Sequence, residues 1–287
     1  MLSVLIFAIA GAIAQLVDGT LGMAFGITSS TLLIALGATP VAASAAVHFA
    51  EIGTTLASGT SHWLAGNVDK RILIRLAIPG GIGAFFGATL LSSISLSSGR
   101  VYMSTLLLVL GLILLIRFGV GFTIIPPITG RPRSKMLVPL GGVAGFIDAS
   151  GGGGWGPVTT PTLLTLTKTQ PRRVIGTVSA SEFVVAISAS AGFIFGMSNQ
   201  NIDFKVVGGL LLGGVIMAPI AAKLAGKLPH APFGALIGGA VLIINSRIML
   251  NYFEASNNLK YTIYAAIVLI TLFLAYKAWK REKTQSV

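Results

Sequence analysis

The chain contains no cysteine among its 287 residues. Disulfide bonds, thiol nucleophiles and cysteine-ligated metals are therefore excluded. Only three histidines are present, so the clustered imidazole and carboxylate ligands of a catalytic zinc are not indicated. No phosphate-binding loop ending in Gly-Lys-Ser or Gly-Lys-Thr occurs, so the sequence carries no ATPase motif of its own. We accordingly expect no enzyme, no metal and no cofactor.

Charge is also scarce, because charged residues make up 10% of the chain against roughly 25% in an average soluble domain. So few charges cannot cover a soluble globule of this length, but they suffice if most of the surface faces lipid. Several apolar stretches reach about 20 residues, the length that crosses the hydrocarbon core of a bilayer. The 36 glycines are compatible with membrane helices, where small residues allow close packing. The composition predicts an all-α polytopic membrane protein.

The charges that are present are unbalanced, with 20 lysines and arginines, 8 acidic residues and a net charge of +12. A nucleic-acid-binding protein is one interpretation, but the basic residues lie in short connections between apolar spans. That distribution is typical of topology signals that keep loops in the cytoplasm. We expect a multi-pass protein of the plasma membrane, with lipid and a small anion as partners and no nucleic acid. Whether it forms a homo-oligomer stays open.

The apolar sequence falls into long and short segments. The long segments are 41–65, 72–92, 100–120, 173–197, 204–226, 231–252 and 261–279. The short segments are 2–17, 27–37, 137–147 and 157–167. The short segments form two pairs, and each pair is divided by a glycine-rich break that begins with an aspartate. The first break runs from Asp18 to Gly26 and the second from Asp148 to Gly156.

The two halves of the sequence are related by a constant spacing. At an offset of 130 residues the matching pairs are Asp18 and Asp148, Gly22 and Gly152, and Gly26 and Gly156. At an offset of 131 they are Pro40 and Pro171, and Glu51 and Glu182. The shared order indicates an internal duplication, and a period this long fits the paired halves of a secondary transporter. We predict a first repeat over 1–121, a cytoplasmic linker over 122–136, a second repeat over 137–253, and a C-terminal transmembrane helix with a basic cytoplasmic tail over 254–287.

Two topologies are compatible with the short pairs. If each pair is one broken helix that crosses fully, the last three basic clusters fall outside the cell. If each pair is a re-entrant hairpin, every basic cluster falls in the cytoplasm, and the charge distribution favours this arrangement. The N-terminus then lies outside and the C-terminus inside. Each repeat is then a re-entrant helical hairpin plus three transmembrane helices. Because three is an odd number of crossings, the two repeats are inverted, and the last transmembrane helix is an addition.

The breaks are the candidate substrate site. Non-helical backbone at membrane depth survives only inside protein or against a cavity. A helix that begins just after such a break directs free N–H groups and its positive dipole end inward, which suits an anion. The alternative is that the glycines only let helices pack closely. The predicted substrate-binding residues, between the two hairpin tips, are Gly22, Met23, Gly26, Thr28, Ser29, Gly152, Gly153, Trp155, Gly156, Thr159 and Thr160.

Ionisable residues inside membrane spans are costly and often mark proton relays. The candidates for a coupling or structural role are Asp18, His48, Glu51, Asp148, Ser179 and Glu182. The structural alternative is that the aspartates cap freed N–H groups and the glutamates hold the neighbouring hairpin. His48 and Glu51 are three residues apart and share a helix face. His62 lies nearer a helix end, where an interfacial position is expected.

Two stretches resemble the two halves of the TauE/SafE family of sulfite exporters. The first consists of Asp18–Gly26, Pro40, His48 and Glu51. The second consists of Gly151–Gly156, Pro157, Pro161, Pro171 and Glu182. The resemblance implies a proton-coupled secondary transporter of the bacterial inner membrane that acts as an exporter. Its substrates are implied to be sulfur-containing or related organic anions such as sulfite, sulfoacetate or thiosulfate. The alternative is an anion channel or uniporter that uses the same site without proton coupling.

Overall fold

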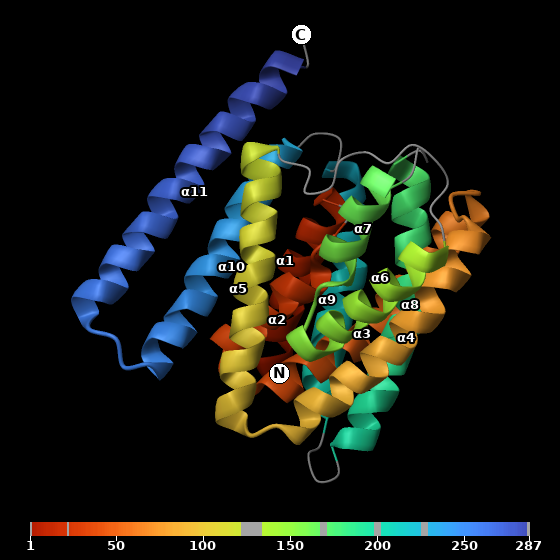
Figure 1. Ribbon diagram of the computed structural model, residues 1–287, viewed down its shortest axis with the longest axis horizontal. Coiled ribbons are helices and arrows are strands. Elements are labelled where there is room, and N and C mark those ends of the chain that lie inside the picture. Colours follow the sequence, from red (N-terminus) through yellow and green to blue (C-terminus); the bar gives the residue numbers. More distant parts are fainter. Residues whose placement is uncertain are drawn as a thin grey trace.

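The computed structural model describes residues 2–21, 23–121, 134–166, 171–197, 202–224 and 229–285. Over these ranges the chain is built from α-helices, which confirms the predicted class (Figure 1). The helices are α1 (Leu2–Leu21), α2 (Phe25–Ala35), α3 (Pro40–Leu64), α4 (Lys70–Ser93), α5 (Leu96–Val120), α6 (Ser134–Gly151), α7 (Trp155–Leu166), α8 (Pro171–Gly196), α9 (Phe204–Leu224), α10 (His230–Tyr252) and α11 (Asn257–Gln285). Most of the predicted linker lies outside the described residues.

Six of the described helices are long and apolar enough to cross a membrane, judged by length and composition. They are α4, α5, α8, α9, α10 and α11. Helix α3 is equally long, with 25 residues, but it is not among the six because polar side chains such as His48 and Glu51 interrupt its apolar sequence. The expected multi-pass membrane protein is thus supported by the helices themselves.

Both breaks are narrower than the sequence predicted. Helix α1 continues through Asp18 to Leu21, and α6 continues through Asp148 to Gly151. The next helices begin at Phe25 and Trp155, so the described non-helical backbone is confined to residues 23–24 and 152–154. The aspartates do not open the breaks, because each sits in the last turn of a helix.

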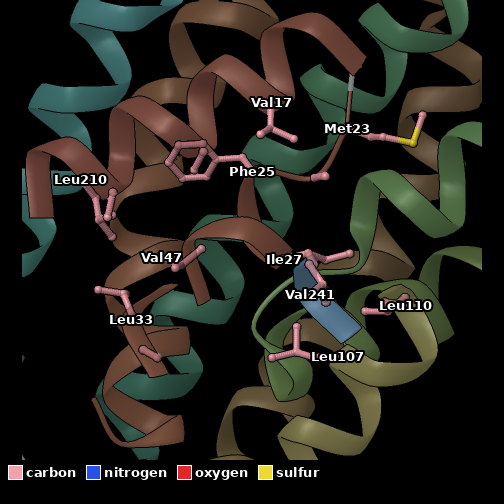
Figure 2. Packing of buried hydrophobic residues seen from close by; sticks show 14 of the residues in the cluster. Val17, Met23, Phe25, Ile27, Leu33, Val47, Leu107, Leu110, Leu210 and Val241 are labelled. Atoms are coloured by element: carbon pink, nitrogen blue, oxygen red, sulfur yellow. The ribbon is translucent and has the colours of Figure 1, made fainter. Parts of the chain in front are cut away.

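Helix α2 lies inside the protein. Eight of its 11 residues are buried, including Phe25, Ile27 and Leu33. Figure 2 shows these side chains packed among Val47 of α3, Leu107 of α5 and other apolar residues of the same cluster. A short helix that is covered on nearly all sides is a core element, not a lipid-facing span. Figure 1 likewise shows the turn between α6 and α7 inside the bundle, away from its two ends.

The first helix of each predicted half packs against a helix of the other half. Helix α1 makes its most extensive contacts with α9, and α6 makes its own with α4. Glycines allow both pairs to approach at the backbone. A Cβ on Gly213 of α9 would lie 1.8 Å from the carbonyl oxygen of Ala8, and a Cβ on Gly145 of α6 would lie 2.0 Å from that of Gly80. Such small-residue contacts hold membrane helices together.

Helix α11 stands at the edge of the bundle. It packs against α10 and α5, and Figure 1 shows it apart from the helices that carry the breaks. Large apolar side chains such as Leu269 and Phe273 are exposed on it, as expected of a helix that faces lipid. The site described below therefore lies in the part of the chain that precedes α11.

Candidate functional site

The two breaks meet inside the protein. A Cβ on Gly153 would lie 2.2 Å from the backbone nitrogen of Ile27, and a Cβ on Gly26 would lie 2.8 Å from the Cα of Gly153. Gly153 has a φ of +142°, a conformation that favours glycine. The Ser30 hydroxyl of α2 also donates a hydrogen bond to the carbonyl oxygen of Gly152. The backbone of one break is therefore packed directly on the backbone of the other.

Each aspartate accepts a hydrogen bond from the first N–H group after its break. The Phe25 N–H donates to Asp18 Oδ1 at 3.3 Å, and the Trp155 N–H donates to Asp148 Oδ1 at 2.9 Å. The two contacts share a separation of seven residues, and they are the contacts expected of the capping role. Because a new helix starts with N–H groups that have no partner in the helix, these bonds remove two donors that an anion would otherwise use.

Asp148 also forms a buried pair with His48. The Nε2 atom of His48 is 3.2 Å from Asp148 Oδ2, and its Nδ1 atom is 2.8 Å from the carbonyl oxygen of Ser44. A carbonyl can only accept, so Nδ1 carries a proton and donates. The contact between Nε2 and Oδ2 is a hydrogen bond only when one of these two atoms carries a proton.

Glu51 lies in the same cluster, one turn after His48 on α3. Its carboxylate and the ligand atoms of His48 and Asp148 lie within 4.8 Å of one another, and Glu51 is 2% exposed. A Cβ on Gly26 would lie 3.1 Å from its Oε1 atom, so Glu51 reaches the contact between the breaks. Three such groups are also of the type that binds metals. In this structure two of them, His48 and Asp148, contact each other through Nε2 and Oδ2.

A cavity of about 440 Å³ lies beside the contact between the breaks. Both breaks contribute to its lining, through Met23 and Gly156. The polar residues that line it are Gln15, Asp18, Thr54, Ser58, Ser61, His62, Ser179 and Glu182. The cavity thus extends from the centre of the protein to His62, close to the end of α3.

The cavity is acidic in character. The carboxyl groups of Asp18 and Glu182 come from α1 and α8, and His62 is the further ionisable residue of the described lining. Ser58 and Ser179 join the two sides through a contact of 3.1 Å between their hydroxyl oxygens. No lysine or arginine contributes among the residues that the structure describes. This lining is unexpected for a site that receives an anion alone.

The predicted substrate-binding residues have different surroundings. Met23 and Gly156 line the cavity, Gly26 and Gly153 form the contact between the breaks, and Gly22 lies outside the described residues. The Gly152 carbonyl is occupied by Ser30, as described above.

The aromatic and hydroxyl candidates are buried away from this lining. Trp155 is fully buried, and its indole N–H donates to the Val178 carbonyl oxygen at 3.2 Å, so it packs and does not line the cavity. The Thr159 hydroxyl donates to the Trp155 carbonyl oxygen. The hydroxyls of Thr28, Ser29 and Thr160 are buried without a hydrogen-bond partner in the described part of the chain.

Several residues of the cavity were missed from the sequence. His62 is half-buried and lines the cavity near the end of α3, so an interfacial position alone does not describe it. Thr54, Ser58 and Ser61 follow Glu51 at intervals of three or four residues, which places them on one face of α3. The regular spacing of these polar residues along α3 is the signal in the sequence that could have identified them as cavity-lining residues.

Residues 7–248 match the family described as Sulfite exporter TauE/SafE. The chain belongs to the TauE/SafE family. It is also 46% identical over 275 residues to a protein named "Probable membrane transporter protein YtnM" from Bacillus subtilis (strain 168), and this match covers 95% of the chain and 91% of that protein. No solved structure matches.

As a TauE/SafE protein, the chain is a membrane transporter and not an enzyme. The family match ends in α10, so the TauE/SafE region contains both breaks, the buried cluster and the cavity, and leaves out α11. The residues that form the candidate site therefore all lie in the region that matches the family.

Proposed function

We propose that this TauE/SafE protein is a proton-coupled secondary transporter of small sulfur-containing or organic anions such as sulfite or sulfoacetate, and that the solute binds in the cavity beside the hairpin tips. The observation that carries the proposal is the position of this cavity. It touches Met23 of the first break and Gly156 of the second, and it reaches toward one end of the bundle. A solute in it contacts both predicted repeats, as alternating access requires.

The coupling site in this proposal is the buried cluster next to the contact between the breaks. His48 belongs to the first predicted repeat and Asp148 to the second, and the 3.2 Å between Nε2 and Oδ2 lets the two side chains share a proton. A movement of one repeat against the other separates these atoms, so that the proton must be taken up or released. Glu51 lies against both partners and provides the next acceptor for it. The fully buried pair thereby links proton transfer to conformational change.

We propose further that the two repeats are inverted, with the N-terminus outside and the basic loops in the cytoplasm. Two reciprocal features support this: the packing of α1 and α6 against the opposite halves, and the matching hydrogen bonds of Asp18 and Asp148. The lining residue His62 lies near the start of α4, whose first residues are Lys70 and Arg71. With the basic loops inside, the cavity faces the cytoplasm.

Orientation can be measured simply because the chain has no native cysteine. Ser97→Cys places a thiol at an exposed position in the first turn of α5, and Lys70→Cys places one at the exposed start of α4. In intact cells, a membrane-impermeant maleimide is expected to label Ser97→Cys and to label Lys70→Cys only after the membrane is permeabilised. The reverse pattern would place the basic loops outside and contradict the proposed topology.

The transport proposal is tested by uptake into proteoliposomes. Radiolabelled sulfoacetate and sulfite are supplied with and without an imposed pH gradient. We expect accumulation beyond equilibrium that depends on the gradient and collapses when a protonophore is added. Flux that only equilibrates would instead support the channel or uniporter, and the absence of flux for both anions would overturn the proposed substrate class.

A further inference from the structure

Two carboxyl groups from different repeats face the cavity. Asp18 lies in the last turns of α1 and Glu182 lies in the first half of α8. Asp18 is also held by the Phe25 N–H, which fixes its side chain at the cavity wall. Ser179 precedes Glu182 by one turn of α8 and lines the same space. The two carboxyl groups are therefore positioned features of the cavity and not surface charges.

Asp18 accepts the Phe25 N–H, but no basic side chain of the described lining is paired with either carboxyl group. Charged side chains inside a membrane protein are expected to be paired with an opposite charge or a hydrogen-bond donor. His62 is the remaining ionisable residue of the lining. Arg117, the basic side chain that contacts the first break, donates to the sulfur of Met23 at 3.4 Å and is not part of the lining. A positive charge next to Asp18 and Glu182 has to come from elsewhere.

The cavity also offers one place for a negative group. The second residue of α7, Gly156, lines this cavity, and the Trp155 N–H is already bound by Asp148. Pro157 has no N–H group, and the Val158 N–H donates to the Gly154 carbonyl oxygen. The Gly156 N–H is therefore the donor that the start of α7 can present to the cavity, whose lining includes Gly156. An acidic group suits this position.

We propose that the cavity selects organic acids that also carry an ammonium group, of which short aminoalkanesulfonates are the simplest sulfur-containing examples. The ammonium group lies between Asp18 and Glu182, and the sulfonate lies toward Gly156. The inference rests on the proposed function and adds a preference within its substrate class: an acid that carries an ammonium group binds more tightly than the matching acid without one. It explains why a transporter in a family of anion exporters has two carboxyl groups and no basic side chain in the described lining of this cavity.

A matched pair of solutes isolates the ammonium group. The purified protein is titrated with 3-aminopropanesulfonate and with 3-hydroxypropanesulfonate by calorimetry, and both are then supplied as labelled solutes to proteoliposomes. The two compounds have the same length and the same sulfonate, and they differ in the charged amine. Wild-type protein is expected to bind the amino compound at least about tenfold more tightly, because an ion pair near two carboxylates contributes on that order.

The variant Glu182→Gln is expected to reduce this preference strongly while it changes the affinity for the hydroxy compound little. Asp18→Asn is the second variant, since its amide oxygen can still accept the Phe25 N–H. Asp203→Asn, which removes one carboxylate at an exposed position outside the cavity, serves as the control and should keep the preference. Equal binding of both compounds by the wild type, or tighter binding of the hydroxy compound, would overturn the inference.

The outcomes separate this inference from the proposed function. Accumulation of sulfoacetate and of both propanesulfonates alike leaves the transporter in place and overturns the selection of zwitterions. Accumulation of the amino compound without the hydroxy compound supports the selection. If neither propanesulfonate binds, the inference is overturned. Sulfoacetate uptake in the same vesicles would then still support the proposed function, and its absence would count against that function as well.

Discussion

Gly153→Ala is expected to abolish transport and to lower the melting temperature of the protein in detergent. The added Cβ would lie 2.2 Å from the nitrogen of Ile27 and 2.4 Å from the carbonyl carbon of Gly26. Both neighbours are backbone atoms, so no side chain can rotate away. The φ of +142° adds strain for any residue with a side chain, at about 1–3 kcal/mol, and overpacking adds about 1–3 kcal/mol more.

Gly208→Ala is the matched control, because a Cβ at this position of α9 meets no atom within 4 Å. Thermal unfolding and uptake are measured for both variants. Gly208→Ala should behave as the wild type in both assays. A Gly153→Ala protein with unchanged stability and transport would show that the two breaks do not touch in the functional protein.

Asp148→Asn is expected to fold but to lose proton-driven accumulation. The amide oxygen of asparagine can still accept the Trp155 N–H, and its NH₂ group can donate to His48 Nε2, so both contacts of Asp148 survive. The variant lacks the carboxyl group that shares a proton with the imidazole. Uptake should therefore fall to the level of simple equilibration while exchange of solute across the membrane continues.

Asp203→Asn provides the control for this change. Asp203 is exposed and accepts a hydrogen bond from the Lys205 N–H outside the site, so its variant should accumulate solute normally. Asp148→Ala removes the cap as well as the proton site, and it should fail to give folded protein. Accumulation by Asp148→Asn at the wild-type level would exclude the pair as the coupling site.

The sequence predicted the breaks well because aspartate, glycine and proline recur in the same order at a fixed offset. It overestimated their length, since an aspartate that caps the next helix can itself lie in the last turn of the preceding one. The packing of α1 and α6 against the opposite halves could not be predicted in this way. Those contacts depend on which face of each helix presents glycine to a segment far along the chain, as Gly213 and Gly145 do.

The residues named from the sequence stay predictions for the site, but the structure shows how some of them are arranged. Asp18, Met23, Gly156, Ser179 and Glu182 were all named from the sequence, and they line one cavity. The sequence offered capping by the aspartates as an alternative, but only the hydrogen-bond geometry of the breaks shows that they occupy N–H groups that it assigned to the anion. The sequence also predicted a substrate between the hairpin tips. In the structure the tips are in backbone contact, and the cavity lies beside them.

The central claim, that solute and proton move together, is tested most directly by measuring the proton. Proteoliposomes that contain a pH-sensitive dye are given a sulfoacetate gradient with no initial pH difference. We predict a change in internal pH that requires sulfoacetate, is absent with Asp148→Asn and is retained with Asp203→Asn. Sulfoacetate flux of normal rate without any change in internal pH would contradict the account.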